Sequence, residues 1–292
     1  MLGAYYTKGF DSHELFDHLL ISQFSSYHQH LNQHNVIYID FSALPDPCDC
    51  YQEYIDWIKE QLRKDMENVK DTYIFILDEW DSIFYKKFMT ENDKVAYLDF
   101  LKVLLKDQSY VELAYMTGVL PITTYSRRSQ FHMFQEYNFM NDSVYESFFG
   151  FTEDEVRNLC EKHKSIRYDE LQYWYDGYDL SDGKRLFNPR SVHCAFMDQV
   201  CLNYWTETGP MNEIAEYVEH NVDEVREDIV KLVSGIPVEI ELQGYSAGEL
   251  QLDTRDEILS IMAVFGFLSY HDGSKRNRKA VKRNAGSNAC RK

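Results

Sequence analysis

Residues 73–81 join five consecutive apolar or aromatic side chains directly to two acids, Asp78 and Glu79. A short run of this kind, rich in Ile and Phe, is typical of a strand that is buried on both faces, as strands in parallel sheets are. Parallel sheets bind their ligands at the carboxyl ends of the strands. The pattern therefore predicts a buried parallel strand whose two acids lie at a ligand-binding edge.

Two acids at this edge suit phosphoryl chemistry. An Asp there can hold Mg²⁺ against nucleotide phosphates, and the Glu after it can polarise a water molecule for attack on the terminal phosphate. We therefore assign Mg²⁺ binding to Asp78 and water activation to Glu79. The residues alone leave an alternative open, because an Asp after a strand also caps the next helix by accepting a backbone N–H hydrogen bond. Asp78 and Asp81 both suit that structural role.

Two other segments, 35–41 and 111–118, show the same strand pattern. Between the three segments, apolar residues recur at helical spacing over 51–69 and 93–106. Strands that alternate with helices of this length indicate βαβ crossovers and a mainly parallel sheet. We therefore predict an α/β domain over residues 1–150.

Thr117 ends the third predicted strand. A polar side chain at that position can sense a terminal phosphate or orient the attacking water, although Thr is also a common turn residue. Arg127 and Arg128 follow in a loop, where they would either place positive charge beside a phosphoryl oxygen or remain solvated. Thr117 is thus the third candidate site residue.

Residues 151–273 show mainly helical spacing, and Thr152 with Glu155 predicts a capping box at the start of one helix. Residues 173–178 form an aromatic cluster, which we interpret as packing around a turn at Gly177. We therefore predict a mostly helical second domain.

The chain has 292 residues, a formal net charge of -18 and a hydrophobic share of 44%. These values fit a globular protein and argue against broad adhesion to nucleic acid or anionic lipid. We find neither a long apolar run nor a secretion signal, so we expect a cytoplasmic protein without membrane contact. Residues 274–292 differ, because they hold eight basic residues and no acid. We predict a disordered tail there, whose alternative role is nucleic-acid binding.

Four sequence blocks stand in the order and approximate spacing of one known family. They are residues 76–81, 115–122, 149–156 and 174–178. On these blocks, the chain resembles the predicted AAA-ATPase-like family of bacterial proteins over residues 1–273. The resemblance implies a P-loop NTPase-like core followed by a helical segment, with ATP and Mg²⁺ as cofactors. In many members a nuclease domain of the PD-(D/E)XK type follows.

By position, Asp78 matches the Mg²⁺-coordinating acid of the family's Walker B motif, Glu79 its water-activating acid and Thr117 its sensor. Family members begin with a strand and a phosphate loop, the Walker A motif, but no GxxxxGK[ST] pattern occurs in this sequence. We therefore expect a truncated core that lacks the N-terminal strand, the phosphate loop and the nuclease domain. Both ATP binding and ATP hydrolysis are then expected to be impaired.

Other functions remain open at this point. The first alternative is a non-catalytic interaction module, or a remnant of a larger ATPase-nuclease protein, that binds an unknown protein partner. A zinc site that combines Cys48 and Cys50 with the histidines at 28, 30 and 34 is the weakest candidate, because the one-residue spacing is tighter than in common zinc motifs.

Overall fold

The structure is a computed structural model that describes residues 1–45, 47–66, 71–118, 133–137, 144–180, 183–204, 222–241, 254–264, 268–272 and 278–283. Arg127 and Arg128 lie outside these residues. None of the described helices is long and apolar enough to cross a membrane. The chain divides into two compact units. Among the described residues, the first unit holds those up to 118 and 133–134, and the second holds those from 135 onward.

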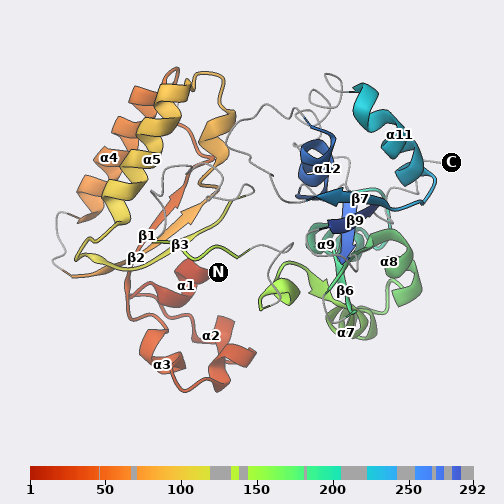
Figure 1. Cartoon of the computed structure of the whole chain (residues 1–292). Helices are drawn as coiled ribbons and strands as arrows, with labels where there is room; N and C mark the ends of the chain where they lie inside the picture. The colour runs from red at the N-terminus through yellow and green to blue at the C-terminus, as the bar shows by residue number, and fades with distance from the viewer. Residues whose placement is uncertain are drawn as a thin grey trace. The chain divides into compact units, whose positions relative to one another are not determined.

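The first unit is built on a parallel sheet with the strand order β1-β2-β3 (Figure 1). Its strands are β1 (Asn35–Asp40), β2 (Tyr73–Asp78) and β3 (Val111–Met116). The crossover from β1 to β2 contains α4 (Tyr51–Met66), and the one from β2 to β3 contains η2 (Ser82–Tyr85) and α5 (Glu91–Leu105). The predicted α/β class and parallel sheet are therefore confirmed.

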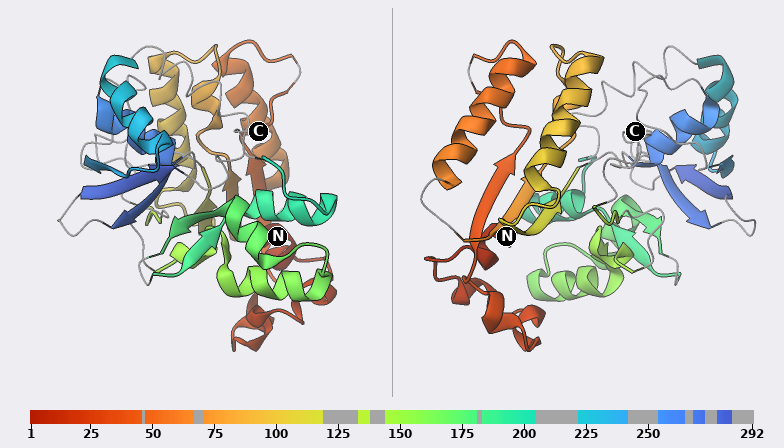
Figure 2. Two further views of the ribbon diagram at one scale, coloured as in Figure 1. Left: turned by 90° about the vertical axis from the view of Figure 1, so that its right-hand side faces the viewer. Right: turned by 60° about the vertical axis from the view of Figure 1, so that its left-hand side comes forward.

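The two faces of this sheet differ in how well they are covered. Successive rows of the register point to opposite faces. One row is Ile37, Phe75 and Ala114, and the next is Tyr38, Ile76 and Tyr115. The first row has a buried Ile37 and Phe75, whereas Tyr38 is 57% exposed and Tyr115 is 47% exposed. Helices α4 and α5 lie side by side over one face of the sheet (Figure 2). The row of tyrosines thus belongs to a more open face.

The segment before β1 forms several short helices and no single continuous helix. They are α1 (Leu2–Tyr6), α2 (His13–Phe16), η1 (Leu20–Gln23) and α3 (Tyr27–His30). The Ser12 hydroxyl donates to the Ala4 carbonyl at 2.8 Å, and the Asn32 amide donates to the carbonyls of Ala4 and Thr7 at 2.9 and 3.0 Å. Such bonds from side chain to backbone compete with a continuous helix.

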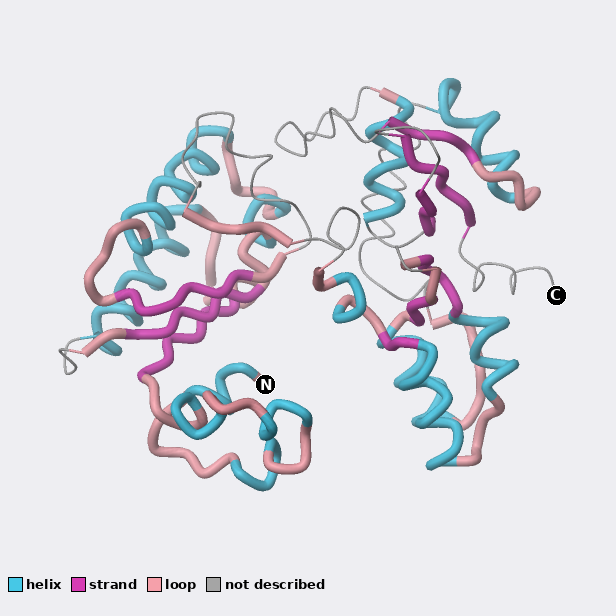
Figure 3. The backbone as a smooth tube through the Cα atoms, turned by 60° about the horizontal axis from the view of Figure 1, so that its bottom comes forward, coloured by secondary structure: helices cyan, strands magenta, loops and turns pink. Residues whose placement is uncertain are grey.

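The second unit combines helices with antiparallel sheets (Figure 3). The first sheet has the order β4-β6-β5, from β4 (Phe151–Thr152), β6 (Arg185–Phe187) and β5 (Asp176–Asp179). Its neighbours in sequence are η3 (Glu146–Phe148), α7 (Glu153–His163), α8 (Tyr168–Tyr175) and α9 (Pro189–Asp198). The prediction of a mostly helical second domain missed these strands, because strands of two to four residues are too short to show a period-2 pattern in the sequence.

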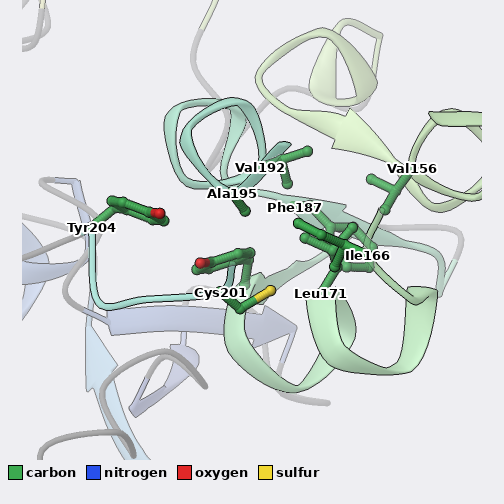
Figure 4. Close-up of a cluster of buried hydrophobic side chains, with 9 residues drawn as sticks. Val156, Ile166, Leu171, Phe187, Val192, Ala195, Cys201 and Tyr204 are labelled. Carbon is green, nitrogen blue, oxygen red and sulfur yellow. The ribbon is translucent and has the colours of Figure 1, made fainter. Parts of the chain in front are cut away.

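A compact apolar core joins these elements of the second unit (Figure 4). Leu171, Phe187 and Val192 are fully buried in it. The Tyr175 hydroxyl exchanges hydrogen bonds with the backbone N–H and carbonyl of Leu202, both at 2.9 Å. Tyr175 therefore packs in the core as predicted, whereas Tyr173 is exposed, and Gly177 lies in strand β5 and not in a turn.

The predicted capping box at the start of α7 is confirmed. The Thr152 hydroxyl accepts from the backbone N–H of Glu155 at 3.4 Å, and the Glu155 carboxylate accepts from the N–H of Thr152 at 2.8 Å. Two otherwise unpaired donors at the helix end are satisfied in this way.

A second antiparallel sheet has the order β7-β9-β8. In the sequence, α11 (Val222–Val233) precedes β7, and α12 (Arg255–Val264) lies between β7 and β8. Its strands are β7 (Val238–Glu241), β8 (Leu268–Asp272) and β9 (Arg278–Arg283). The prediction of a disordered tail over 274–292 is therefore wrong for 278–283. Ala280 and Val281 lie opposite Glu239 and Val238 there, so backbone pairing with two strands orders a segment whose composition alone indicated disorder.

Candidate functional site

The register of the parallel sheet brings three polar residues to one edge. Asp40 lies opposite Asp78 at the carboxyl ends of β1 and β2. The backbone of Thr117 continues the ladder on the other side, where its N–H donates to the carbonyl of Leu77 at 2.9 Å and its carbonyl accepts from Trp80 at 3.0 Å. Two of the three predicted site residues, Asp78 and Thr117, therefore meet across neighbouring strands, with Asp40 beside them.

The Asp78 carboxylate is held from both of its oxygens. The Thr117 hydroxyl donates to Oδ1, and the Tyr38 hydroxyl donates to Oδ2 at 2.8 Å. The Thr117 hydrogen bond is the main cause that holds the pKa of Asp78 below its ordinary value, and the Tyr38 bond adds to it. The hydrogen bond between Tyr38 and Asp78 also raises the pKa of Tyr38 to about 12. At neutral pH the site thus contains an ionised Asp78 between two hydroxyl donors.

Glu79 follows with an unusual backbone. Its φ of 53° lies in the left-handed region, which disfavours residues that carry a Cβ. Partial removal from water raises the pKa of its carboxyl, and the charges of Asp81, Asp78 and Asp40 raise it further. Strained backbone and a shifted carboxyl pKa are both features that gather at functional sites.

The turn after β2 is anchored in the core of the unit. Trp80 and Asp81 are buried, and the hydroxyl of the fully buried Tyr97 donates to the Trp80 carbonyl at 2.7 Å. A side chain at Gly118 would bring its Cβ to 2.5 Å from the Trp80 ring and 2.6 Å from the Asp81 carboxylate. The left-handed Glu79 is therefore supported by close packing on both sides of the turn.

The structure also tests whether Asp78 and Asp81 act only as helix caps. Asp78 uses its carboxylate for Thr117 and Tyr38, and the backbone N–H of Glu79 contributes to lowering its pKa. Asp81 occupies the N-cap position of η2, but its side chain makes no capping hydrogen bond there. Helix capping therefore does not account for the acids at this strand end.

The oxygen donors at this edge suit a Mg²⁺ ion whose remaining ligands come from substrate phosphates, and not a metal ion held by protein side chains alone. Mg²⁺ prefers oxygen ligands and is commonly held by one or two carboxylates together with substrate phosphates. Asp78 and the Thr117 hydroxyl offer such donors at this edge, and Asp40 lies beside them with Oδ1 accepting from the N–H and hydroxyl of Ser42 at 2.9 and 2.6 Å. Among the described residues, no group of three or more His, Cys, Asp or Glu side chains is arranged to hold a metal ion by itself. The edge thus suits a cation that arrives with phosphates.

The histidines of the weak zinc candidate have other contacts. His30 Nδ1 lies 3.0 Å from His34 Nε2, and His34 Nδ1 lies 3.1 Å from the Glu112 carboxylate. The described residues bring neither Cys48 nor Cys50 into a metal-binding group with them.

The sequence interpretation missed two residues of this edge. Asp40 lies near the carboxyl end of a predicted strand, so the rule that selected Asp78 would also have selected it. Tyr38 could not be found in this way, because its contact with Asp78 depends on the register between β1 and β2.

Comparisons with protein-family models, with curated proteins and with solved structures found no match to this chain. The resemblance to the AAA-ATPase-like family and the P-loop NTPase-like form of the fold therefore stay predictions. The α/β class and the parallel sheet rest on the structure itself.

Proposed function

We propose that the first unit is an AAA-ATPase-like domain that binds a nucleoside triphosphate together with Mg²⁺ at the carboxyl edge of β1, β2 and β3. The observation that carries this proposal is the Asp78 carboxylate, which hydroxyls from both neighbouring strands hold in place beside the strained Glu79. Such an edge is where open α/β sheets bind ligands.

In this proposal each residue of the edge has its own role. Asp78 is the ligand of the cation, with Thr117 holding Oδ1 and standing closest to the phosphates. Glu79 orients or deprotonates the attacking water, for which a carboxyl with a raised pKa is suited. Bound Mg²⁺ would supply positive charge to the phosphoryl oxygens.

Binding and hydrolysis are expected to differ in this chain. These 292 residues contain no GxxxxGK[ST] pattern, so they do not themselves supply a lysine and backbone cradle of that type for the β- and γ-phosphates. Removal of a single contact of this electrostatic kind costs about 10²–10³-fold in rate. We therefore propose measurable nucleotide binding with very slow hydrolysis by the chain alone.

Thermal unfolding with and without Mg·ATP tests binding. A ligand at 100 times its Kd stabilises the folded state by about 2.7 kcal/mol. We expect the wild-type chain to gain stability and Asp78→Asn to lose most of that gain. Asp99→Asn, at an exposed position on α5, is the matched control and should respond like the wild type. Equal responses of all three proteins, or no response from any, would contradict the proposal.

The open face of the sheet supports the second candidate, a non-catalytic interaction module. Tyr38, Leu113 and Tyr115 lie on this face and are each more than two-fifths exposed. Exposed apolar side chains on one face are a feature of interaction sites. If Mg·ATP has no effect on the wild-type chain, this function is the one that the first unit supports.

A further inference from the structure

We propose that Tyr38 is a positioning residue, which fixes the Asp78 carboxylate in the orientation that binds a divalent cation. This inference rests on the proposed function, since it concerns how the same edge of the sheet receives the cation. It adds a residue that the strand-end rule does not select, because Tyr38 lies two positions before the end of β1.

The two hydroxyl donors bind different oxygens of the Asp78 carboxylate. Thr117, directly after β3, binds Oδ1, and Tyr38 binds Oδ2 from β1, so Asp78 is held from opposite sides of β2. A carboxylate held by Thr117 alone could turn about its terminal torsion, which is broad for Asp. With both donors in place, the plane of the carboxylate is fixed.

The hydroxyl contact leaves room for a cation. An ionised carboxylate has about four lone-pair positions, and the two hydroxyls use one on each oxygen. A cation can therefore bind Asp78 while Tyr38 remains hydrogen-bonded. Partners that hydrogen-bond a metal ligand in this manner orient it, and their removal typically costs about 10- to 100-fold in metal affinity.

The hydroxyl of Tyr38, and not its ring, is the part that orients Asp78. The Tyr38 side chain is 57% exposed, so the ring contributes little to the core. Asp40 and Glu79 add negative charge near Tyr38, and Asp81 adds negative charge near Glu79. In such an acidic group, a neutral donor satisfies Asp78 without adding the positive charge that would repel a cation.

Tyr115 offers a matched control in the same structure. It lies in the same row as Tyr38, on the other side of β2, and is 47% exposed. On its side of β2, the Asp78 oxygen is bound by Thr117 and not by Tyr115. Removing the Tyr115 hydroxyl therefore makes the same chemical change at a similar site without touching the Asp78 contact.

The test measures Mn²⁺ binding to the full chain in the presence of ATP, with free Mn²⁺ counted by electron paramagnetic resonance. Mn²⁺ is the probe because carboxylate and water oxygens suit it as they suit Mg²⁺. We expect Tyr38→Phe to weaken Mn²⁺ binding by about tenfold. Tyr115→Phe should bind like the wild type, and Asp78→Asn should remove binding at this site.

Two further readouts separate positioning from general stability. The melting temperature without metal should be the same for Tyr38→Phe and Tyr115→Phe. Mn²⁺ should change the ultraviolet difference spectrum of tyrosine in the wild type and in Tyr115→Phe, but not in Tyr38→Phe. A Tyr38→Phe protein that binds Mn²⁺ with unchanged affinity would overturn this inference and leave the proposed function intact. Absence of binding in the wild type, or equal binding in Asp78→Asn, would overturn both.

Discussion

At the scale of single residues, Glu79 is the clearest sign that the strand end serves a function. Its left-handed backbone and its position among Asp78, Asp81 and Asp40 both disfavour a glutamate. A left-handed conformation costs a residue with a Cβ about 1–2 kcal/mol. A residue that opposes stability in two ways is expected where chemistry requires its carboxylate.

Replacing Glu79 separates these two costs. Glu79→Gln removes the charge, and Glu79→Gly also removes the Cβ. We expect Glu79→Gly to be more stable than Glu79→Gln by about 0.5–1 kcal/mol, because the relief of about 1–2 kcal/mol is offset by about 0.5–1 kcal/mol of added chain entropy. Urea unfolding measures the difference. A less stable Glu79→Gly protein would show that the backbone at this residue is not strained.

The pH dependence of Glu79→Gln follows from the raised pKa of Glu79. Because the folded protein holds this proton more tightly than the unfolded chain, ionisation of Glu79 lowers stability as pH rises through its folded pKa. The variant should therefore be more stable than the wild type at pH 7. It should match the wild type near pH 4, below the ordinary value for Glu of about 4.3. A stability gain that does not change with pH would contradict this assignment.

At the scale of elements, the site depends on how the turn after β2 is fixed to α5. The Tyr97 hydroxyl of α5 donates to the Trp80 carbonyl inside the core, so one helix holds the backbone next to Glu79. The buried aromatic rings of Phe41 and Phe84 contact the Tyr97 ring edge-on, with centroids 5.5 and 5.6 Å away.

Tyr97→Phe removes only that hydrogen bond. We expect a loss of about 1–3 kcal/mol in the free energy of unfolding, because the Trp80 carbonyl is left without this donor. Nucleotide binding should weaken together with stability, since the turn that carries Glu79 loses its anchor. Denaturant unfolding and calorimetry of Mg·ATP binding check both effects, and unchanged unfolding would show that the anchor is not needed.

The sequence predicts elements well where the pattern is long and apolar. The three parallel strands and both crossover helices follow from such patterns, and so do Asp78 and Thr117 as strand-end residues. Strands β4, β5 and β6 do not, because they have only two to four residues. Tyr38 and β9 depend on pairing between distant segments, and pairing cannot be derived from local spacing.

At the scale of the whole molecule, the proposed nucleotide site belongs to the first of two compact units. The second unit has its own core around Leu171, Phe187 and Val192, and none of the three predicted site residues belongs to it. The chain has a net charge of -18, so we expect the proposed nucleotide, a polyanion, to approach this edge only together with a cation.

Nuclear magnetic resonance with Mn²⁺ and ATP tests this central claim most directly, because the paramagnetic ion broadens the amide signals nearest to it. We predict that the signals of Glu79, Trp80 and Thr117 broaden first, while those of Tyr73 and Val111, at the amino ends of strands in the same sheet, broaden least. Asp78→Asn should remove the effect. Broadening centred elsewhere in the chain, or the same broadening in Asp78→Asn, would contradict the account.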